Sequence, residues 1–547
     1  MIIKSNWRLA NVKTRRETGL DYVMQNINLN TPFGRKVLKD LKAYHPGQEA
    51  DLTEEFDRAD AMIEFVKKNP RMVDKLQEIF MDVKDTTLTI ESSSKDTLSV
   101  VELYEVKALL LQMRQIIKCT EGNESNVPAT YHLDDTESLL DELDPSGDRL
   151  NTFYIYDEFS EVLRDLRAKK REYERLIRKA QKKRRDEIRR EYGIQLTPKF
   201  DIVVAKSHPS FEVIGTIDDL EVVDQDYMSV TFQLKPSEEA YAYIGETERL
   251  NGEIEDEEEK VRKVLSLKIS EYEDVLLENC KKIGALDFAL AKAAFSIKRN
   301  LARPEIVHEH VVEFENGRNL AVEEVVTRKG KEYCPVSLSL KDGVTVITGA
   351  NMGGKTISLK LAGQVAILAQ YGFFVPAERA RIGLSSYMQI LIGDSQSVER
   401  GLSSFGSEME ELKEILDKGQ ERSLILVDEI ASGTNPTEGT ALTKSLVDYL
   451  IERPYISLIT THFETVTERE GVVNMQVRGL ADCDFVLLGR ELQYASRKDR
   501  INIISKYMDY RLCRVENETQ VPKDALNIAT MLGIDKVIIE GAKKYIK

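Results

Sequence analysis

The stretch GVTVITGANMGGKTISLK, residues 343–360, decides how the C-terminal half of this chain folds. Its first part is a β-branched apolar run, which is typical of a buried strand. Its second part has the spacing G-x-x-x-x-G-K-T, which lets backbone N–H groups wrap a phosphate at the N-terminus of the following helix. A glycine-rich turn without a ligand is the alternative. The strand before the glycines and the helix after them favour a phosphate-binding loop.

Two residues of this loop have specific predicted roles. The Lys355 ammonium is predicted to reach the β- and γ-phosphates of ATP, and the Thr356 hydroxyl is predicted to bind Mg²⁺. ATP and Mg²⁺ are therefore the expected cofactors. The residues of the loop that are predicted to bind ATP are Gly349, Ala350, Asn351, Met352, Gly353, Gly354, Lys355 and Thr356.

A second apolar strand, SLILVDE at 423–429, ends in two adjacent carboxylates. We expect Asp428 to orient Mg²⁺ and Glu429 to orient or deprotonate the attacking water. The alternative is a strand that ends in acidic residues by chance. A phosphate-binding loop earlier in the same chain makes the functional interpretation the stronger one.

A third apolar strand leads into Thr460, Thr461, His462 and Phe463. A histidine at the end of a strand is often structural. Here two other motifs end neighbouring strands, so His462 is predicted to contact the γ-phosphate or the attacking water. Together with Lys355 and Glu429 it completes the predicted catalytic set.

A serine-rich segment, GLSSFGSEM at 401–409, precedes an acidic helix start. Capping of that helix is the simple explanation. In dimeric ATPases of the ATP-binding-cassette type, a serine loop in this place reaches the nucleotide of the other subunit. Ser403 and Ser404 are therefore also predicted to bind ATP.

The periodicity of the chain predicts an α plus α/β protein. Apolar residues at helical spacing predict a helical core over 1–156, and a lever-like antiparallel coiled coil over 157–300. Short β-branched runs at about 198–235 predict a small β insertion in the lever. Alternating strands and helices over 301–520 predict an ATPase domain, and 521–547 is predicted to form a helix-turn-helix dimerisation element.

The two arms of the predicted lever carry opposite charge. Residues 164–191 hold 14 Lys and Arg against 6 Asp and Glu, whereas residues 246–260 hold eight acidic residues against two basic ones. We expect the arms to pair with opposite charges facing each other. A solvated helix face and a face that contacts phosphates both remain open for the basic arm.

The composition argues against several classes of protein. Hydrophobic residues make up 42% of the 547 residues, which is enough for packed cores. The net charge of −16 argues against bulk nucleic-acid binding. No apolar run could span a membrane, and five scattered cysteines without a C-x-x-C pair indicate a reducing, cytoplasmic location. His308 and His310 could share one face of a strand, but no third metal ligand is visible near them.

The ATPase motifs resemble, in order, those of the MutS family. The segments that carry this resemblance are TGANMGGKT, AQYGFFVPAERARIG, GLSSFGSEM, LVDEIASGTNPTEGTAL and TTHFETVTE. GDSQSVERGLSSF and GTNPTEG are most similar to the branch without the mismatch-recognition domain. LNTPFGRKVL resembles the start of the family's helical core, and VPKDALNIATMLGIDKVIIEGAKKYI resembles its dimerisation helices.

This resemblance implies a homodimer, or a heterodimer with a related chain, whose ATP hydrolysis drives movement of the lever. The family role would be binding of DNA mismatches or DNA structures in repair. Neither a mismatch-reading domain nor a nuclease domain is recognisable, and the clamp at the lever tip is reduced to the β insertion. The alternative is a protein-remodelling ATPase, such as a reactivating factor for a client enzyme like a cobalamin-dependent aminomutase. A chromosome-maintenance ATPase would need longer coiled coils.

Overall fold

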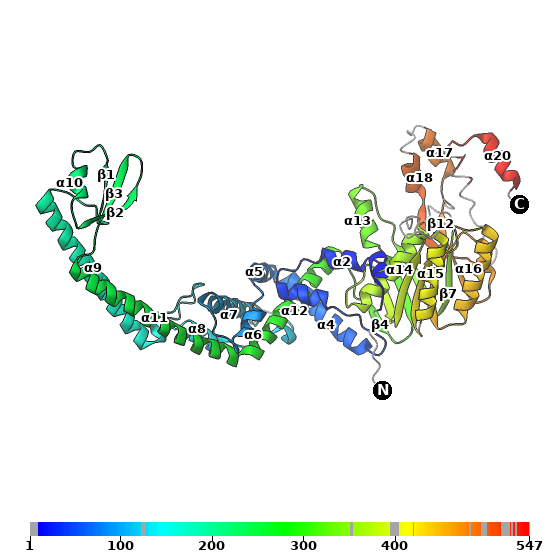
Figure 1. Ribbon diagram of the computed structural model, residues 1–547. Helices are drawn as coiled ribbons and strands as arrows, with labels where there is room; N and C mark the ends of the chain where they lie inside the picture. Colours follow the sequence, from blue (N-terminus) through cyan, green and yellow to red (C-terminus); the bar gives the residue numbers. More distant parts are fainter. Residues whose placement is uncertain are drawn as a thin grey trace. The chain divides into compact units, whose positions relative to one another are not determined.

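The computed structural model describes residues 9–121, 127–349, 354–393, 404–419, 421–480, 483–493, 500–515, 526, 529–530 and 533–545 (Figure 1). The chain forms two compact units. The first unit comprises residues 1–81, 120–132 and 283–547, and the second comprises 82–119 and 133–282. The N-terminal helices thus belong to the same unit as the α/β part. The division expected from sequence, with boundaries at 156 and 300, stays a prediction.

The first unit is built on a six-stranded sheet with the strand order β13-β12-β7-β11-β10-β9. Five neighbouring strands of this sheet are parallel, and β13 pairs antiparallel with β12. Parallel strands end at the same edge, so the loops after β7, β10 and β11 come together there. The strands are β7 (Gly343–Thr348), β9 (Tyr387–Ile392), β10 (Ser423–Asp428), β11 (Tyr455–Thr460), β12 (Val472–Gly479) and β13 (Asp509–Arg514).

Helices cover both faces of this sheet. One face packs with α14, through residues such as Leu426 and Leu458, and the other packs with α15 and α16, through residues such as Val427 and Ile459. Adjacent residues of one strand therefore enter different cores, which explains the continuous apolar runs in the sequence. The helices are α13 (Leu320–Arg328), α14 (Lys355–Gln370), α15 (Ser404–Lys418), α16 (Pro436–Ile451), α17 (Phe485–Gln493), α18 (Arg500–Tyr507) and α20 (Lys536–Tyr545), with η4 (Glu464–Glu468).

A four-stranded sheet and a set of N-terminal helices complete the first unit. The sheet has the order β4-β8-β5-β6. Its strands are β4 (Glu305–Val307), β5 (Val311–Gly317), β6 (Val336–Lys341) and β8 (Arg379–Gly383). The helices are α1 (Val12–Glu17), α2 (Leu20–Asn26), α3 (Pro32–Lys39), α4 (Glu49–Lys68) and α5 (Pro70–Met81), with η1 (Ala129–Tyr131).

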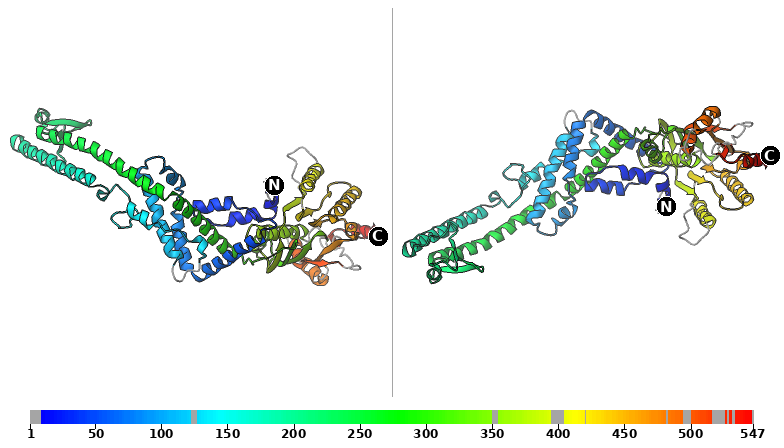
Figure 2. Two further views of the ribbon diagram at one scale, coloured as in Figure 1. Left: turned by 90° about the horizontal axis from the view of Figure 1, so that it is seen from below. Right: turned by 90° about the horizontal axis from the view of Figure 1, so that it is seen from above.

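The second unit contains two long helices that run out and back side by side (Figures 1 and 2). α9 (Glu161–Tyr192) is capped by the Ser160 hydroxyl and ends at Gly193, whose φ of 71° suits a helix C-terminus. α11 (Glu238–Glu271) returns, and a β1-β3-β2 sheet with its own apolar core lies between them in the sequence. The other elements are α6 (Thr87–Ser92), α7 (Val100–Thr120), α8 (Glu137–Leu143), η2 (Asp157–Phe159), β1 (Asp201–Ala205), α10 (Phe211–Gly215), β2 (Leu220–Gln225), β3 (Ser229–Leu234) and the start of α12 (Glu273–Lys298).

The charges of the two long helices do not pair as the sequence analysis expected. Among the described residues, one ion pair crosses from α9 to α11, between Arg167 and Glu258 at 2.6 Å. Arg184 pairs instead with Glu187 on its own helix and with Asp219 before β2. The expectation that the acidic arm neutralises the basic arm is therefore wrong. The basic face of α9 remains largely exposed to solvent.

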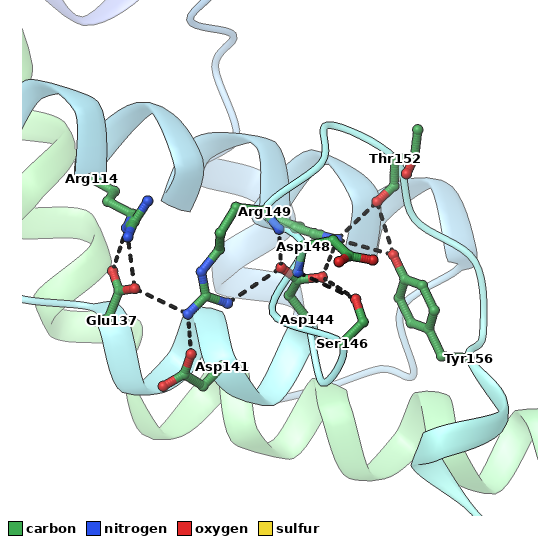
Figure 3. Close-up of polar contacts among 10 residues, drawn as sticks. Arg114, Glu137, Asp141, Asp144, Ser146, Asp148, Arg149, Thr152 and Tyr156 are labelled. Carbon is green, nitrogen blue, oxygen red and sulfur yellow. Dashed lines mark hydrogen bonds and ion pairs between the residues drawn. The ribbon is translucent and has the colours of Figure 1, made fainter.

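A buried polar network lies where α7, α8 and the segment leading to α9 meet (Figure 3). Lys107 is 1% exposed and donates to Asp144 Oδ1 at 3.0 Å, to the Thr152 carbonyl at 2.9 Å and to Tyr156 Oη at 3.0 Å. The Arg149 backbone N–H donates to Asp144 Oδ2 at 2.8 Å. Burial alone would raise the pKa of Asp144, but Lys107 and Arg149 outweigh it and lower that pKa. The network fixes the segment from which α9 departs.

No helix in the described part of the chain combines the length and the apolar character needed to cross a membrane. The five cysteines all lie in described ranges, and none of them forms a disulfide there.

Candidate functional site

The site begins where β7 passes into α14. Gly349 has a φ of 124° and Gly354 a φ of 80°, a region of backbone space that favours glycine. Gly354 is the N-cap of α14 and provides no side-chain cap, and an uncapped helix N-terminus of this kind is a common place for an anion to bind. Ala350, Asn351, Met352 and Gly353 lie outside the described residues.

Lys355 is the most deeply buried charged group of the site, at 3% exposure. Its Nζ donates to the Gly349 carbonyl at 2.7 Å and lies 3.3 Å from Glu429 Oε1. It also lies 3.3 Å from His462 Nδ1. Burial lowers the pKa of Lys355, and the nearby carboxylate of Glu429 opposes that shift. The ammonium therefore sits at the meeting point of three chain segments.

Asp428 ends β10 and is held by two hydroxyls. Thr356 Oγ1 donates to its Oδ2 at 2.9 Å, and Thr460 Oγ1 donates to its Oδ1 at 2.5 Å. Asp428 and Thr460 are register partners on β10 and β11, which places the second hydroxyl. Burial raises the pKa of Asp428, and the hydrogen bonds from the two threonines oppose that shift. The role of Thr460 was not predicted, although its motif was recognised.

Glu429 takes a strained backbone conformation, with a φ of 51° that non-glycine residues rarely adopt. Its N–H donates to the Thr460 carbonyl at 3.0 Å. Its Oε1 lies 2.7 Å from His462 Nε2, and this hydrogen bond is the main reason that the pKa of Glu429 is lowered. The carboxylate is thus kept ionised and held toward Lys355 and His462.

The donor set at Thr356 and Asp428 fits a hard cation. Hydroxyl and carboxylate oxygens are ligands that Mg²⁺ prefers, and Mg²⁺ commonly takes one or two protein ligands beside phosphate oxygens. Within the described ranges, no group of three or more His, Cys, Asp or Glu side chains could hold a metal. The two ring nitrogens of His310 lie 2.6 Å from Asp342 Oδ1 and 3.2 Å from Ser385 Oγ.

A cavity of about 420 Å³ opens beside the start of α14. Gly354, Lys355 and Thr356 are among the residues that line it. The remaining lining is mostly apolar and aromatic, and includes Val322, Val326, Tyr333 and Tyr510. A flat apolar group attached to a phosphate chain would fit this combination. The sequence held no signal for Tyr510, because it comes from β13, far from the loop along the chain.

The serine segment is only partly described. Ser403 lies outside the described residues, and Ser404 begins α15, with its side chain outside the description. Their predicted contact with a nucleotide stays a prediction. Lys355, Thr356, Asp428, Glu429 and His462 are the predicted residues that the structure brings together.

Comparison with known proteins gives one family and several relatives. A family described as "MutS domain V" matches residues 345–546. The chain is 32% identical over 338 residues to a protein named Endonuclease MutS2 from Shouchella clausii, covering 59% of this chain and 41% of that protein. It is 29% identical over 454 residues to an Endonuclease MutS2 from Halothermothrix orenii, covering 76% of this chain and 55% of that protein. The matched regions thus span between two fifths and just over half of these relatives.

Proposed function

Since this chain belongs to the MutS family, we propose that it binds and hydrolyses ATP at the site around Lys355 and Glu429. One observation carries the proposal. Residues from three separate segments, Lys355, Glu429 and His462, converge within 3.3 Å at the carboxyl edge of one parallel sheet. A buried ammonium, an ionised carboxylate and an imidazole at a helix N-terminus suit the transfer of a phosphoryl group to water.

Each side chain has a chemical role in this proposal. The α14 N-terminus and Lys355 bind the β- and γ-phosphates and offset the negative charge that develops there. Glu429 orients the attacking water and accepts its proton, and His462 holds that carboxylate in place. Thr356 and Asp428 would hold Mg²⁺, which supplies charge neutralisation at the phosphates. The cavity lined by Tyr333 and Tyr510 would receive the adenine.

The test is turnover of ATP by the purified chain. Phosphate release should depend on Mg²⁺ and should saturate with ATP, while calorimetry should detect binding of a non-hydrolysable ATP analogue. A chain that does not bind the analogue, or that binds it without releasing phosphate from ATP, would refute the proposal.

The proposal includes a dimer that completes each site with the partner's serine loop. α20 supports it, because Val537, Ile538 and Tyr545 are 80%, 63% and 88% exposed on one short helix. An apolar face of this kind favours a protein partner. A homodimer is the simplest partner arrangement, and movement of the α9–α11 lever would be its output.

DNA is the partner class that this proposal favours over a client enzyme. Exposed basic residues of α9, such as Arg178, Lys179, Lys182 and Lys183, have no ion-pair partner in the described part of the chain. A basic stripe without acidic partners can neutralise phosphates. The relatives reported above carry the name Endonuclease MutS2, and none of those names supports a role in enzyme reactivation.

A further inference from the structure

Glu408 is a buried carboxylate that the proposed hydrolysis does not use. It lies on α15, four residues after the helix begins at Ser404, and is 9% exposed. Its Oε1 accepts a hydrogen bond from the Ala431 backbone N–H at 3.2 Å. Burial raises the pKa of Glu408, and the Ala431 N–H opposes that shift. Burying a carboxylate costs free energy unless a hydrogen bond compensates for it. The hydrogen bond from Ala431 supplies that compensation, and its position suggests a role for Glu408.

The turn that Glu408 contacts is the one that carries Glu429. Ala431 has a φ of 58°, so Glu429 and Ala431 both lie in the left-handed region that non-glycine residues avoid. Such a turn persists only when its surroundings hold it. Ala431 is fully buried, and on its carbonyl side a side chain at Gly439 would come within 2.8 Å of the Ala431 oxygen. On its amide side, the Ala431 N–H is held by the Glu408 carboxylate.

α15 is itself anchored to the rest of the first unit. Glu411, one turn beyond Glu408, forms an ion pair with Lys13 of α1 at 2.6 Å. Lys13 also donates to the Ile392 carbonyl at the end of β9, at 3.4 Å. A helix that is fixed at Glu411 can position the Glu408 carboxylate against the turn.

We propose that Glu408 is a positioning residue that fixes the turn of Glu429 and Ala431 relative to α15, and thereby sets the rate of hydrolysis rather than the affinity for ATP. The inference rests on the proposed ATPase function. α15 begins at Ser404, in the segment predicted to reach the nucleotide of a partner subunit. A shift of α15 on contact with that nucleotide would reach Glu429 through Glu408.

The test compares four variants of the full chain. Glu408→Met removes the acceptor with little change in volume, and Glu408→Asp keeps the charge but withdraws it from the Ala431 N–H. Glu408→Gln keeps an oxygen acceptor at the same reach. Glu410→Met is the matched control, because Glu410 is exposed on the same helix and forms no ion pair with any residue that the structure describes.

We expect Glu408→Met and Glu408→Asp to lower kcat about tenfold or more, which corresponds to the loss of roughly one hydrogen bond to a positioned group. The Kd for a non-hydrolysable ATP analogue should stay within about twofold of the wild type. Glu408→Gln should restore at least about half of kcat, and Glu410→Met should match the wild type. Thermal unfolding of each variant shows that the chain is folded.

Three results would overturn the inference. Unchanged turnover in both Glu408→Met and Glu408→Asp would show that the contact does not matter. A Glu408→Gln variant as slow as Glu408→Met would show that the hydrogen bond is not the cause. A parallel loss of analogue binding would assign Glu408 to binding. A wild-type chain that binds the analogue without turnover would instead refute the proposed function, and the inference with it.

Discussion

The candidate site of the first unit and helix α9 of the second unit use charged side chains in opposite ways. At the carboxyl edge of the six-stranded sheet, Lys355 and Asp428 are 3% and 7% exposed, and each has partners within 3.3 Å. On α9, the basic residues 178, 179, 182 and 183 are exposed and have no ion-pair partner in the described residues. Charged side chains are thus buried in the candidate site and exposed to solvent on α9.

This difference decides what a single substitution can do. A buried charge is strongly coupled to its neighbours, because little solvent screens it. An exposed charge on a helix contributes a few tenths of a kcal/mol and acts on a partner only together with others. Single substitutions should therefore have large effects in the first unit, whereas only grouped substitutions should matter on α9.

The largest effect is expected from Lys355→Ala. It removes the ammonium that faces the phosphates and leaves the strand, the glycines and the helix in place. Binding of ATP by calorimetry should become undetectable, while the unfolding midpoint stays close to that of the wild type. Wild-type affinity in this variant would show that the buried cluster is structural rather than a nucleotide site.

The second unit also contains a buried charged cluster, formed by Lys107 and Asp144. It tests whether burial, rather than the unit, decides the effect of a substitution. Asp144→Leu would leave the Lys107 ammonium buried without its carboxylate, and we expect a loss of about 3–5 kcal/mol in the free energy of unfolding. Denaturant unfolding measures it. The double variant Lys107→Met with Asp144→Leu removes both charges and should recover most of the loss. If the single and double variants are equally unstable, packing rather than charge accounts for the effect.

Glu429→Gln should leave ATP binding intact and slow hydrolysis about 10²-fold or more, because the amide keeps the shape but cannot accept the proton. Phosphate release and analogue binding measure the two properties separately. In the proposed dimer, trapped ATP should also increase the dimer fraction seen by sedimentation. Unchanged turnover would give Glu429 another role.

The sequence predicted the arrangement of the first site because that arrangement follows from local rules. A parallel strand ends at a shared edge, so Lys355, Asp428 and His462 could be expected together from three short motifs. Tyr510 and Glu408 could not be found this way. Tyr510 reaches the cavity from β13, and Glu408 looks like an ordinary solvated acid on an amphipathic helix until the Ala431 N–H is seen beside it.

The pairing of the two long helices could not be predicted because opposite net charge does not fix register. The contacts Ser160–Glu257, Arg167–Glu258 and Tyr173–Tyr243 place the acidic run 253–259 opposite the start of α9. The dense basic run 178–190 lies farther along, toward the β insertion. The two charged runs are therefore offset along the shared length. The pairing of Lys107 with Asp144 was not predicted either. The two residues are far apart in the sequence, with α8 between them, and their charges alone do not show that they meet.

The smallest effect, and the most demanding test, concerns α9 and DNA. If its exposed face contacts a phosphate backbone, binding of duplex DNA should weaken steeply with salt, by about 0.9 in the log–log slope for each phosphate neutralised. Changing Arg178, Lys179, Lys182 and Lys183 to Ala should then flatten that slope by roughly three to four units. Arg184 and Arg185 are left unchanged, because they already pair with Asp219 and Asp186.

The control for this variant removes the same charge elsewhere. Lys67, Lys75, Lys84 and Lys95 are exposed and form no ion pair in the described structure, and their change to Ala should leave the slope almost unaltered. Binding is expected to be weak, with a Kd on the order of 10⁻⁴–10⁻⁶ M at physiological salt, and without preference for mismatched or branched duplexes. Equal log–log salt slopes in both variants would show that α9 does not contact the DNA backbone. Tight binding to a branched duplex that only the α9 variant loses would contradict this expectation. It would show that the basic residues of α9 recognise the structure of the DNA as well as its phosphate charge.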